Sequence, residues 1–154
     1  MQRNRWKQIV LALSLVLVAL TACGQGNSAG AGATTPPAGS GGGGNLANTK
    51  WVLSSMDIGG TQRLPVPRAQ PTLEFSATDA SGKTGCNSFG GPYTVQGDKL
   101  NLGQLIQTMM GCPDDVMQQE KDYMAALNAI QSFAINGKQL TITSSTGILH
   151  FTQV

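Results

Sequence analysis

Few residues with reactive side chains occur in this 154-residue chain, which has three cysteines and one histidine. Cys86 and Ser88 are the candidate nucleophiles, and either would need a base such as His150 within hydrogen-bonding reach. His150 lies between Leu149 and Phe151, so in a strand it faces away from their side of the sheet. We therefore expect a surface histidine and no catalytic site. A small extracytoplasmic hydrolase or thiol enzyme is the alternative.

The spacing of the cysteines suggests a different role. If Cys23 is modified as argued below, Cys86 and Cys112 remain as a pair. In an oxidising compartment such a pair predicts a disulfide, whose loop of about 27 residues would contribute roughly 3.5 kcal/mol. A metal or redox pair of free thiols is the alternative. It is disfavoured because one histidine is too few for a structural zinc site and the spacing is far wider than Cys-X-X-Cys. We expect no metal and no cofactor.

The amino-terminal segment has the three parts of an export signal. A basic start precedes an apolar run over residues 9–20, and the segment ends in Leu20-Thr21-Ala22-Cys23. The run is shorter than the roughly 20 apolar residues that span a bilayer. Leu-Thr-Ala-Cys resembles the lipobox of bacterial lipoproteins, which implies a signal peptide at 1–22 and acylation, including palmitate, of Cys23. A secretory signal with a chance cysteine and an uncleaved anchor are the alternatives.

This resemblance implies an extracytoplasmic protein that is anchored to a membrane through lipid, because two or more acyl chains hold a protein stably. Gly24 follows the cysteine. In a cell with two membranes this residue favours the outer membrane. In a cell with one membrane the protein would lie on the outer face of the cell membrane.

Composition divides the rest of the chain into a tether and one domain. Residues 25–44 contain no charge and no aromatic side chain, so residues 23–45 are predicted to be a lipidated cysteine with a flexible Gly/Ala/Ser/Pro tether. Residues 46–154 are long enough for one small domain. The formal charge of +2 includes three basic residues of the signal. Without them seven Lys and Arg oppose eight Asp and Glu, and no basic patch predicts nucleic acid binding.

The domain reads as short strands separated by turn signals. Strands are expected at 50–56, 71–76, 84–87, 93–96, 99–102, 132–135, 139–143 and 148–152. Residues 77–83 are expected to form a turn, Gly90-Gly91-Pro92 to break a strand, and Asn136-Gly137 to close a hairpin. This pattern predicts a mainly-β α+β domain, in which a small antiparallel curled sheet or barrel packs against one helix.

The single helix is predicted over residues 114–131. Pro113 suits the first turn, and Asp114 and Asp115 suit the positive end of the helix dipole. The expected apolar face comprises Val116, Met117, Tyr123, Met124, Leu127 and Ile130. The expected outward face comprises Gln118, Gln119, Lys121 and Asp122. We expect the methionines at 109, 110, 117 and 124 to fill gaps in the core, with a ligand groove as the alternative.

Several segments together resemble the META domain family, which includes the heat-shock lipoprotein HslJ. They are Gly85-Cys86-Asn87-Ser88-Phe89-Gly90-Gly91-Pro92-Tyr93, Gly97-Asp98-Lys99-Leu100, Met109-Met110-Gly111-Cys112-Pro113 and Gln119-Glu120. The match extends over nearly all of residues 46–154. We interpret Gly85, Asn87, Phe89, Gly90, Met110 and Pro113 as structural signature residues.

The resemblance implies a compact antiparallel β domain with one helix on an envelope protein linked to heat or antibiotic stress. It implies no catalytic residue and no cofactor. The expected function is a non-catalytic interaction with a protein, peptide or lipid, and the expected partners are the membrane and an unknown envelope protein or peptide. A purely structural domain without a ligand is a further alternative.

Overall fold

The computed structural model describes residues 44–154. The predicted signal peptide, Cys23 and nearly all of the predicted tether lie outside the described residues, so those interpretations stay predictions. In the described range no helix is long and apolar enough to cross a membrane.

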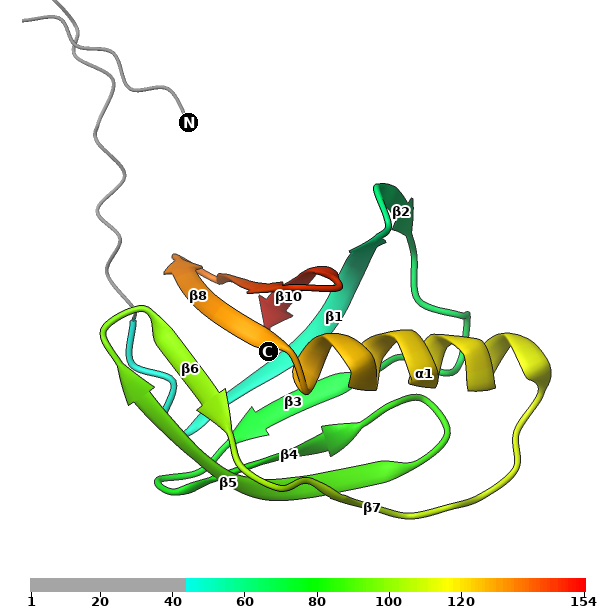
Figure 1. The fold of residues 1–154 in the computed structure, drawn as a ribbon, viewed down its shortest axis with the longest axis horizontal. Helices are drawn as coiled ribbons and strands as arrows, with labels where there is room; N and C mark the ends of the chain where they lie inside the picture. The colour runs from blue at the N-terminus through cyan, green and yellow to red at the C-terminus, as the bar shows by residue number, and fades with distance from the viewer. Residues whose placement is uncertain (1–43) are drawn as a thin grey trace, which may run out of the picture. The chain divides into compact units, whose positions relative to one another are not determined.

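Within residues 44–154, ten strands form one antiparallel sheet that accompanies a single helix (Figure 1). In chain order the elements are β1 (Thr49–Ile58), β2 (Thr61–Arg63), β3 (Thr72–Phe75), β4 (Asp79–Lys83), β5 (Ser88–Gln96), β6 (Lys99–Leu102), β7 (Ile106–Gln107), α1 (Asp114–Leu127), β8 (Ile130–Asn136), β9 (Gln139–Ser144) and β10 (Gly147–Gln153). The strand order is β6-β5-β4-β3-β1-β10-β9-β8, with β2 paired to β1 and β7 to β5. The predicted fold class is confirmed.

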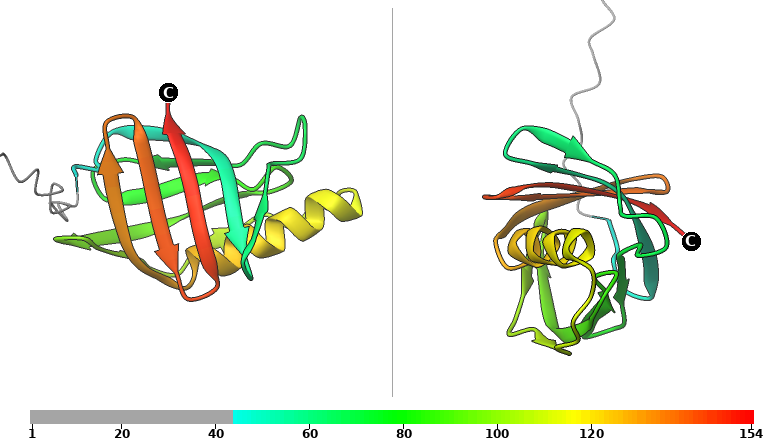
Figure 2. Two further views of the ribbon diagram at one scale, coloured as in Figure 1. Left: turned by 90° about the horizontal axis from the view of Figure 1, so that it is seen from above. Right: turned by 90° about the vertical axis from the view of Figure 1, so that its right-hand side faces the viewer.

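The sheet curls until its two ends nearly meet. The backbone N–H of Phe133 in β8 donates to the carbonyl of Asp98, in the turn between β5 and β6, at 2.8 Å. The helix occupies the space between the layer of β8, β9 and β10 and the layer of β4 and β5, as the end-on view in Figure 2 shows. The result is a nearly closed barrel with α1 as its plug.

Alternation along the strands supplies the core. Leu149 and Phe151 in β10, Leu140 in β9, and Trp51 and Leu53 in β1 are all buried on the inner face. The side chain of His150 is only partly buried and lies on the opposite face from its two neighbours, as predicted.

The helix ends earlier than expected, and its buried face is wider than the predicted apolar stripe. It stops at Leu127 rather than at residue 131, because Ile130 already belongs to β8. Gln119 was expected to point outward but is buried, and so is its neighbour Glu120. Both polar residues occupy the face that hydropathy alone assigned to apolar side chains, because they find hydrogen-bond partners there.

Three assignments between residues 77 and 92 were wrong, two of them because a glycine was interpreted as a turn signal. The predicted turn at 77–83 contains β4, residues 84–87 form a loop instead of a strand, and Gly90-Gly91-Pro92 runs unbroken inside β5. A Cβ on Gly82 would lie 2.0 Å from the carbonyl oxygen of Thr72, and one on Gly91 would lie 2.5 Å from that of Gln104. These glycines permit close backbone approach within the sheet, a use of glycine that resembles a turn signal in the sequence.

Burial of Tyr123 gives a test of the packing of α1. The side chain is fully buried, its hydroxyl donates to the carbonyl of Thr72 at 3.1 Å, and burial raises the pKa of Tyr123 above its ordinary value. The unfolded chain then releases this proton near pH 10 while the folded chain retains it. The contribution of Tyr123 to the free energy of unfolding is therefore fully present below about pH 10. Above that pH it falls by about 1.4 kcal/mol per pH unit.

We expect the free energy of unfolding, measured in urea between about pH 9 and pH 11, to fall more steeply for the wild type than for Tyr123→Phe. Tyr93 is present in both proteins, so its contribution cancels in the comparison. Parallel curves for the two proteins would contradict the packing described for Tyr123.

Candidate functional site

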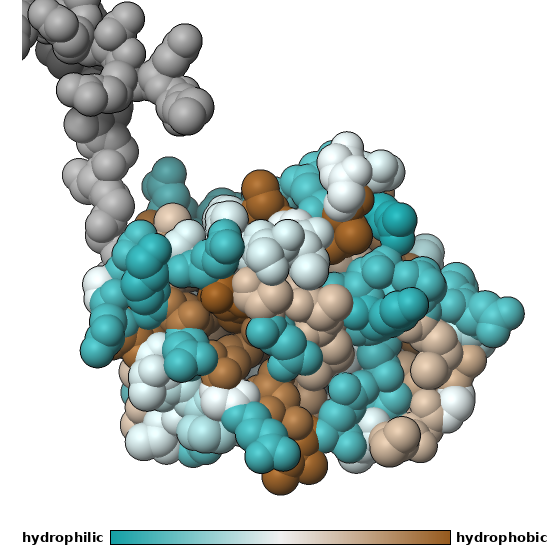
Figure 3. Space-filling view, in the orientation of Figure 1, coloured by the Kyte–Doolittle hydropathy of each residue, from teal (hydrophilic) through white to brown (hydrophobic). Residues whose placement is uncertain are grey.

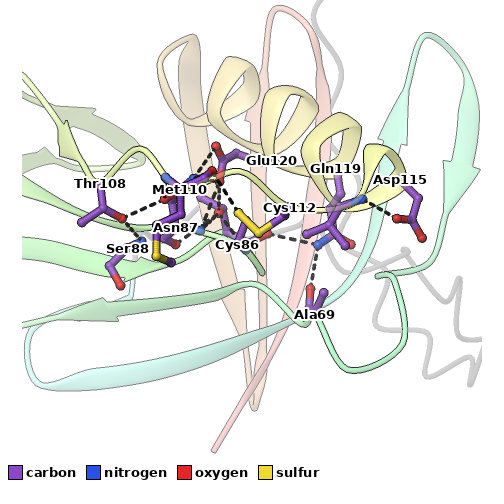
Figure 4. Close-up of a disulfide and its surroundings, with 12 residues drawn as sticks. Ala69, Cys86, Asn87, Ser88, Thr108, Met110, Cys112, Asp115, Gln119 and Glu120 are labelled. Carbon is purple, nitrogen blue, oxygen red and sulfur yellow. Dashed lines mark hydrogen bonds between the residues drawn. A yellow bond between two sulfur atoms is a disulfide. The ribbon is translucent and has the colours of Figure 1, made fainter.

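Three segments that are distant in sequence meet at the amino-terminal end of α1 (Figure 4). They are the loop from β4 to β5 with Cys86 and Asn87, the loop from β7 to α1 with Met110 and Cys112, and the first turns of α1 with Glu120. The meeting point contains most of the signature residues predicted from the sequence. It is the candidate site.

The predicted disulfide joins two of these segments. Cys86 and Cys112 are bonded to each other, with their Cα atoms 6.0 Å apart. The disulfide prediction is confirmed, and Cys86 therefore presents no free thiol in this structure. Within residues 44–154, no three His, Cys, Asp or Glu side chains gather as a metal site.

Asn87 links all three segments through its side-chain amide. Its Nδ2 donates to both carboxylate oxygens of Glu120 at 3.0 Å, and its Oδ1 accepts from the Met110 N–H at 2.7 Å and the Thr108 hydroxyl at 2.9 Å. An amide has donors and an acceptor on one short side chain. Asn87 can therefore bond a carboxylate on one side and a backbone N–H on the other.

Glu120 is a buried carboxylate that is held entirely by neutral donors. Its side chain is largely covered, with 8% relative exposure. Besides the Asn87 amide, Oε2 accepts from the Thr84 hydroxyl and from the Asn87 backbone N–H at 3.2 Å. The ion pairs among residues 44–154 join other side chains, so none of them neutralises Glu120.

Gln119 ties the helix to a second loop. Its Nε2 donates to the carbonyls of Ala69 at 2.6 Å and Thr84 at 3.0 Å, and its Oε1 accepts from the Val66 N–H at 2.6 Å. Gly85 makes this approach possible. It has a φ of +101°, and a Cβ there would lie 2.6 Å from Gln119 Nε2.

The other predicted signature residues serve packing and helix initiation. The Phe89 ring packs edge-on against Tyr123 with centroids 6.0 Å apart, and the Pro113 carbonyl accepts from the Met117 N–H at 3.0 Å at the start of the helix. Gly90 lies within β5 facing Ser81 of β4. The structural interpretation fits these positions.

An open pocket of about 400 Å³ lies beside the buried cluster. It is lined by Asn87, Gln107, Thr108, Met109, Met110, Gly111, Met117 and Glu120. Met109, Met110 and Met117 are exposed by 96%, 58% and 37%, so the expectation that they fill the core was wrong; Met124 does pack against the core. Hydrophobic surface is visible at the lower right of Figure 3, over the segment between β7 and α1.

The residues considered for catalysis lie in different surroundings. His150 Nε2 is 3.1 Å from Asp57 Oδ2, on the neighbouring strand β1. Ser88 begins β5, where its N–H donates to the Thr108 hydroxyl at 3.1 Å. No hydrogen bond of the described residues joins Ser88 to His150.

Sequence reasoning did not identify the roles of Glu120, Gln119, Thr84 and Thr108. The single signal in the chain was Gln119-Glu120 itself, a polar pair that interrupts the apolar side of α1. Its meaning depends on Asn87 and Thr84, whose position next to the helix follows only from the fold.

Placing a second carboxylate beside Glu120 tests the buried cluster. Asn87→Asp replaces two donated hydrogen bonds by charge repulsion, so we expect a loss of about 3 kcal/mol or more at neutral pH. The loss should shrink as the pH falls into the carboxylate range, because two adjacent carboxyls then share a proton. Urea unfolding at pH 4 and pH 7 measures both effects. Asn101→Asp, at an exposed position of β6, is the control and should have little effect.

Removal of the disulfide tests its contribution to stability. The bond spans 26 positions, and the chain-entropy model assigns a loop of this size about 3.5 kcal/mol. We expect the Cys86→Ser, Cys112→Ser double variant to melt several degrees lower than the wild type in non-reducing buffer. Identical melting curves would show that the bond is absent in solution or contributes nothing.

Comparisons with known proteins agree with the fold. The sequence matches the META domain over residues 44–154. A protein from Burkholderia xenovorans solved by NMR is 32% identical with a TM-score of 0.63, covering 71% of this chain and 83% of that one. A second NMR structure, at 21% identity and a TM-score of 0.58, covers 70% of this chain and 90% of its own and supports the fold alone.

No curated protein matches the chain. The family match nevertheless extends over every described residue, including the Asn87–Glu120 cluster and the disulfide. The chain belongs to the META domain family.

Proposed function

We propose that this protein is a membrane-anchored envelope lipoprotein whose META domain acts by binding a protein, peptide or lipid, without catalysis. The proposal rests on a contrast between buried polar and exposed apolar side chains at the candidate site. Buried polar groups are satisfied by one another, while three methionine side chains above them are exposed to solvent.

The polar cluster has the character of a scaffold. Among the described residues, every buried side-chain nitrogen and oxygen has a hydrogen-bond partner. Catalytic groups are typically aimed at a substrate, whereas Asn87 and Glu120 are aimed at each other and at the backbone. This arrangement favours the structural interpretation of the family signature.

The exposed surface has the character of a binding site. Exposed apolar patches on soluble domains commonly mark interaction surfaces, and methionine is frequent where one surface accepts different partners. The pocket volume of about 400 Å³ lies within the range of ligand sites. These features support interaction as the mode of action.

The anchor is supported by the sequence and by the cysteine chemistry. Leu20-Thr21-Ala22-Cys23 follows a short apolar run, and the chain between it and the domain is uncharged. The disulfide fits an oxidising compartment outside the cytoplasm. A role in the response to heat or antibiotic stress is the physiological setting that the family resemblance implies.

Intact mass spectrometry of the native protein, with and without reductant, tests the anchor. We expect a chain that begins at Cys23, has added acyl mass including palmitate, and gains the mass of two hydrogen atoms on reduction. Cys23→Ala is the matched control and should lose both the acyl mass and the membrane fraction. A native wild-type chain without acyl mass would contradict the lipoprotein proposal.

A further inference from the structure

The pocket beside the buried cluster contains a negative charge with spare capacity to accept hydrogen bonds. Glu120 lines the pocket, and its Oε1 accepts from Asn87 Nδ2 alone, while Oε2 receives the other donors. A carboxylate offers about four lone-pair positions. Oε1 therefore has lone-pair capacity left for a further donor.

No ion pair among residues 44–154 compensates this charge. The lining residues include no Lys or Arg, and the ion pairs of Lys50 with Glu74 and of Arg63 with Asp122 do not involve Glu120. Asp114 and Asp115 begin the helix that supplies Met117, which adds further negative charge at this end. Charge complementarity therefore favours a cationic group in the pocket.

Three methionines make much of the remaining pocket wall apolar and adaptable. The side chains of Met109, Met110 and Met117 provide unbranched, polarisable surface, and Ile106, which precedes the lining residue Gln107 in β7, is 78% exposed. Such a wall suits apolar side chains of varied shape. An extended peptide can place apolar side chains on both sides of a Lys or Arg, so it can offer this wall apolar groups and a cation together.

The backbone next to the pocket offers a free strand edge. Thr108 N–H donates to the Ser88 carbonyl at 3.0 Å, and Gln107 lies opposite Phe89 in the antiparallel pair. In an antiparallel pair only every second residue forms backbone hydrogen bonds with the neighbouring strand. Thr108 is such a residue, so the N–H and carbonyl of Gln107 point away from β5. Within residues 44–154, β7 pairs only with β5.

We propose that the pocket and the outer edge of β7 together bind an extended polypeptide segment of a partner protein that has Lys or Arg between apolar residues. The basic group bonds Glu120 Oε1, the apolar side chains contact the three methionines, and the backbone adds to β7. This inference rests on the proposed interaction function and names the chemistry of the partner.

The test uses the full chain as it is purified, placed in nanodiscs of zwitterionic lipid where Cys23 is acylated and in buffer where it is not, with ¹³C-labelled methionine methyl groups. The probe is the peptide Val-Thr-Val-Arg-Val-Thr-Val, and the matched peptides have Gln or Glu in place of Arg. We expect the Arg peptide to shift the methyl signals of Met109, Met110 and Met117 and to leave that of the buried Met56 unchanged. The Gln peptide should bind roughly tenfold more weakly, and the Glu peptide more weakly still.

Two substitutions at the exposed position 109 test whether peptide binding depends on the charge beside the pocket or on the shape of the side chain there. Met109→Lys should weaken binding of the Arg peptide roughly tenfold, whereas Met109→Glu should preserve or strengthen it. Met109 is 96% exposed, so neither change disturbs folding, and an unchanged Met56 signal checks this. Leu64→Lys, at a 75% exposed position on the loop after β2, is the control and should bind normally.

Three outcomes would overturn the inference: no binding of the Arg peptide, equal binding of the Arg and Gln peptides, or equal effects of Met109→Lys and Met109→Glu. Peptide binding that shifts only other residues would retain an interaction function while removing it from this pocket. The mass measurement of Cys23 acylation is independent of all these results. Failure of the anchor and failure of the pocket are therefore distinguishable.

Discussion

The hydrogen bonds between Asn87 and Glu120 are the constraint on which the end of the barrel depends. A buried carboxylate is costly unless donors surround it, and here every donor comes from the loop between β4 and β5. The same Asn87 amide fixes Met110 in the loop that precedes the helix. These hydrogen bonds therefore hold the β4–β5 loop, the helix and the loop from β7 to α1 together.

The helix connects this polar end to the apolar interior. Glu120 and Gln119 bond the loops on one side, and three residues later Tyr123 enters the core between Phe89 and Phe151. The helix is thus held by hydrogen bonds near its amino-terminal end and by burial of apolar side chains further along. The disulfide adds a covalent link at the polar end, where α1 itself contributes few apolar side chains.

The sequence was sufficient for properties that depend on local pattern. Alternation predicted the strands of the carboxyl-terminal hairpins, Asn136-Gly137 predicted their turn, and two cysteines in an oxidising setting predicted the disulfide. The β4 strand was missed because its glycine, Gly82, accommodates neighbouring backbone instead of making a turn. The burial of Glu120 was missed because hydropathy describes a side chain, whereas its partners are supplied by a loop more than thirty residues away.

The error over the methionines has a physical explanation that also bears on function. Met109 and Met110 are apolar enough for the core, yet their loop is fixed by Asn87 and by Cys112, so they cannot turn inward. A surface that is fixed in advance loses less conformational entropy when a partner binds. The buried polar cluster and the exposed apolar wall therefore complement each other. The first determines where the loop lies. That position keeps the methionines exposed to solvent beside Glu120, which is in no ion pair among residues 44–154.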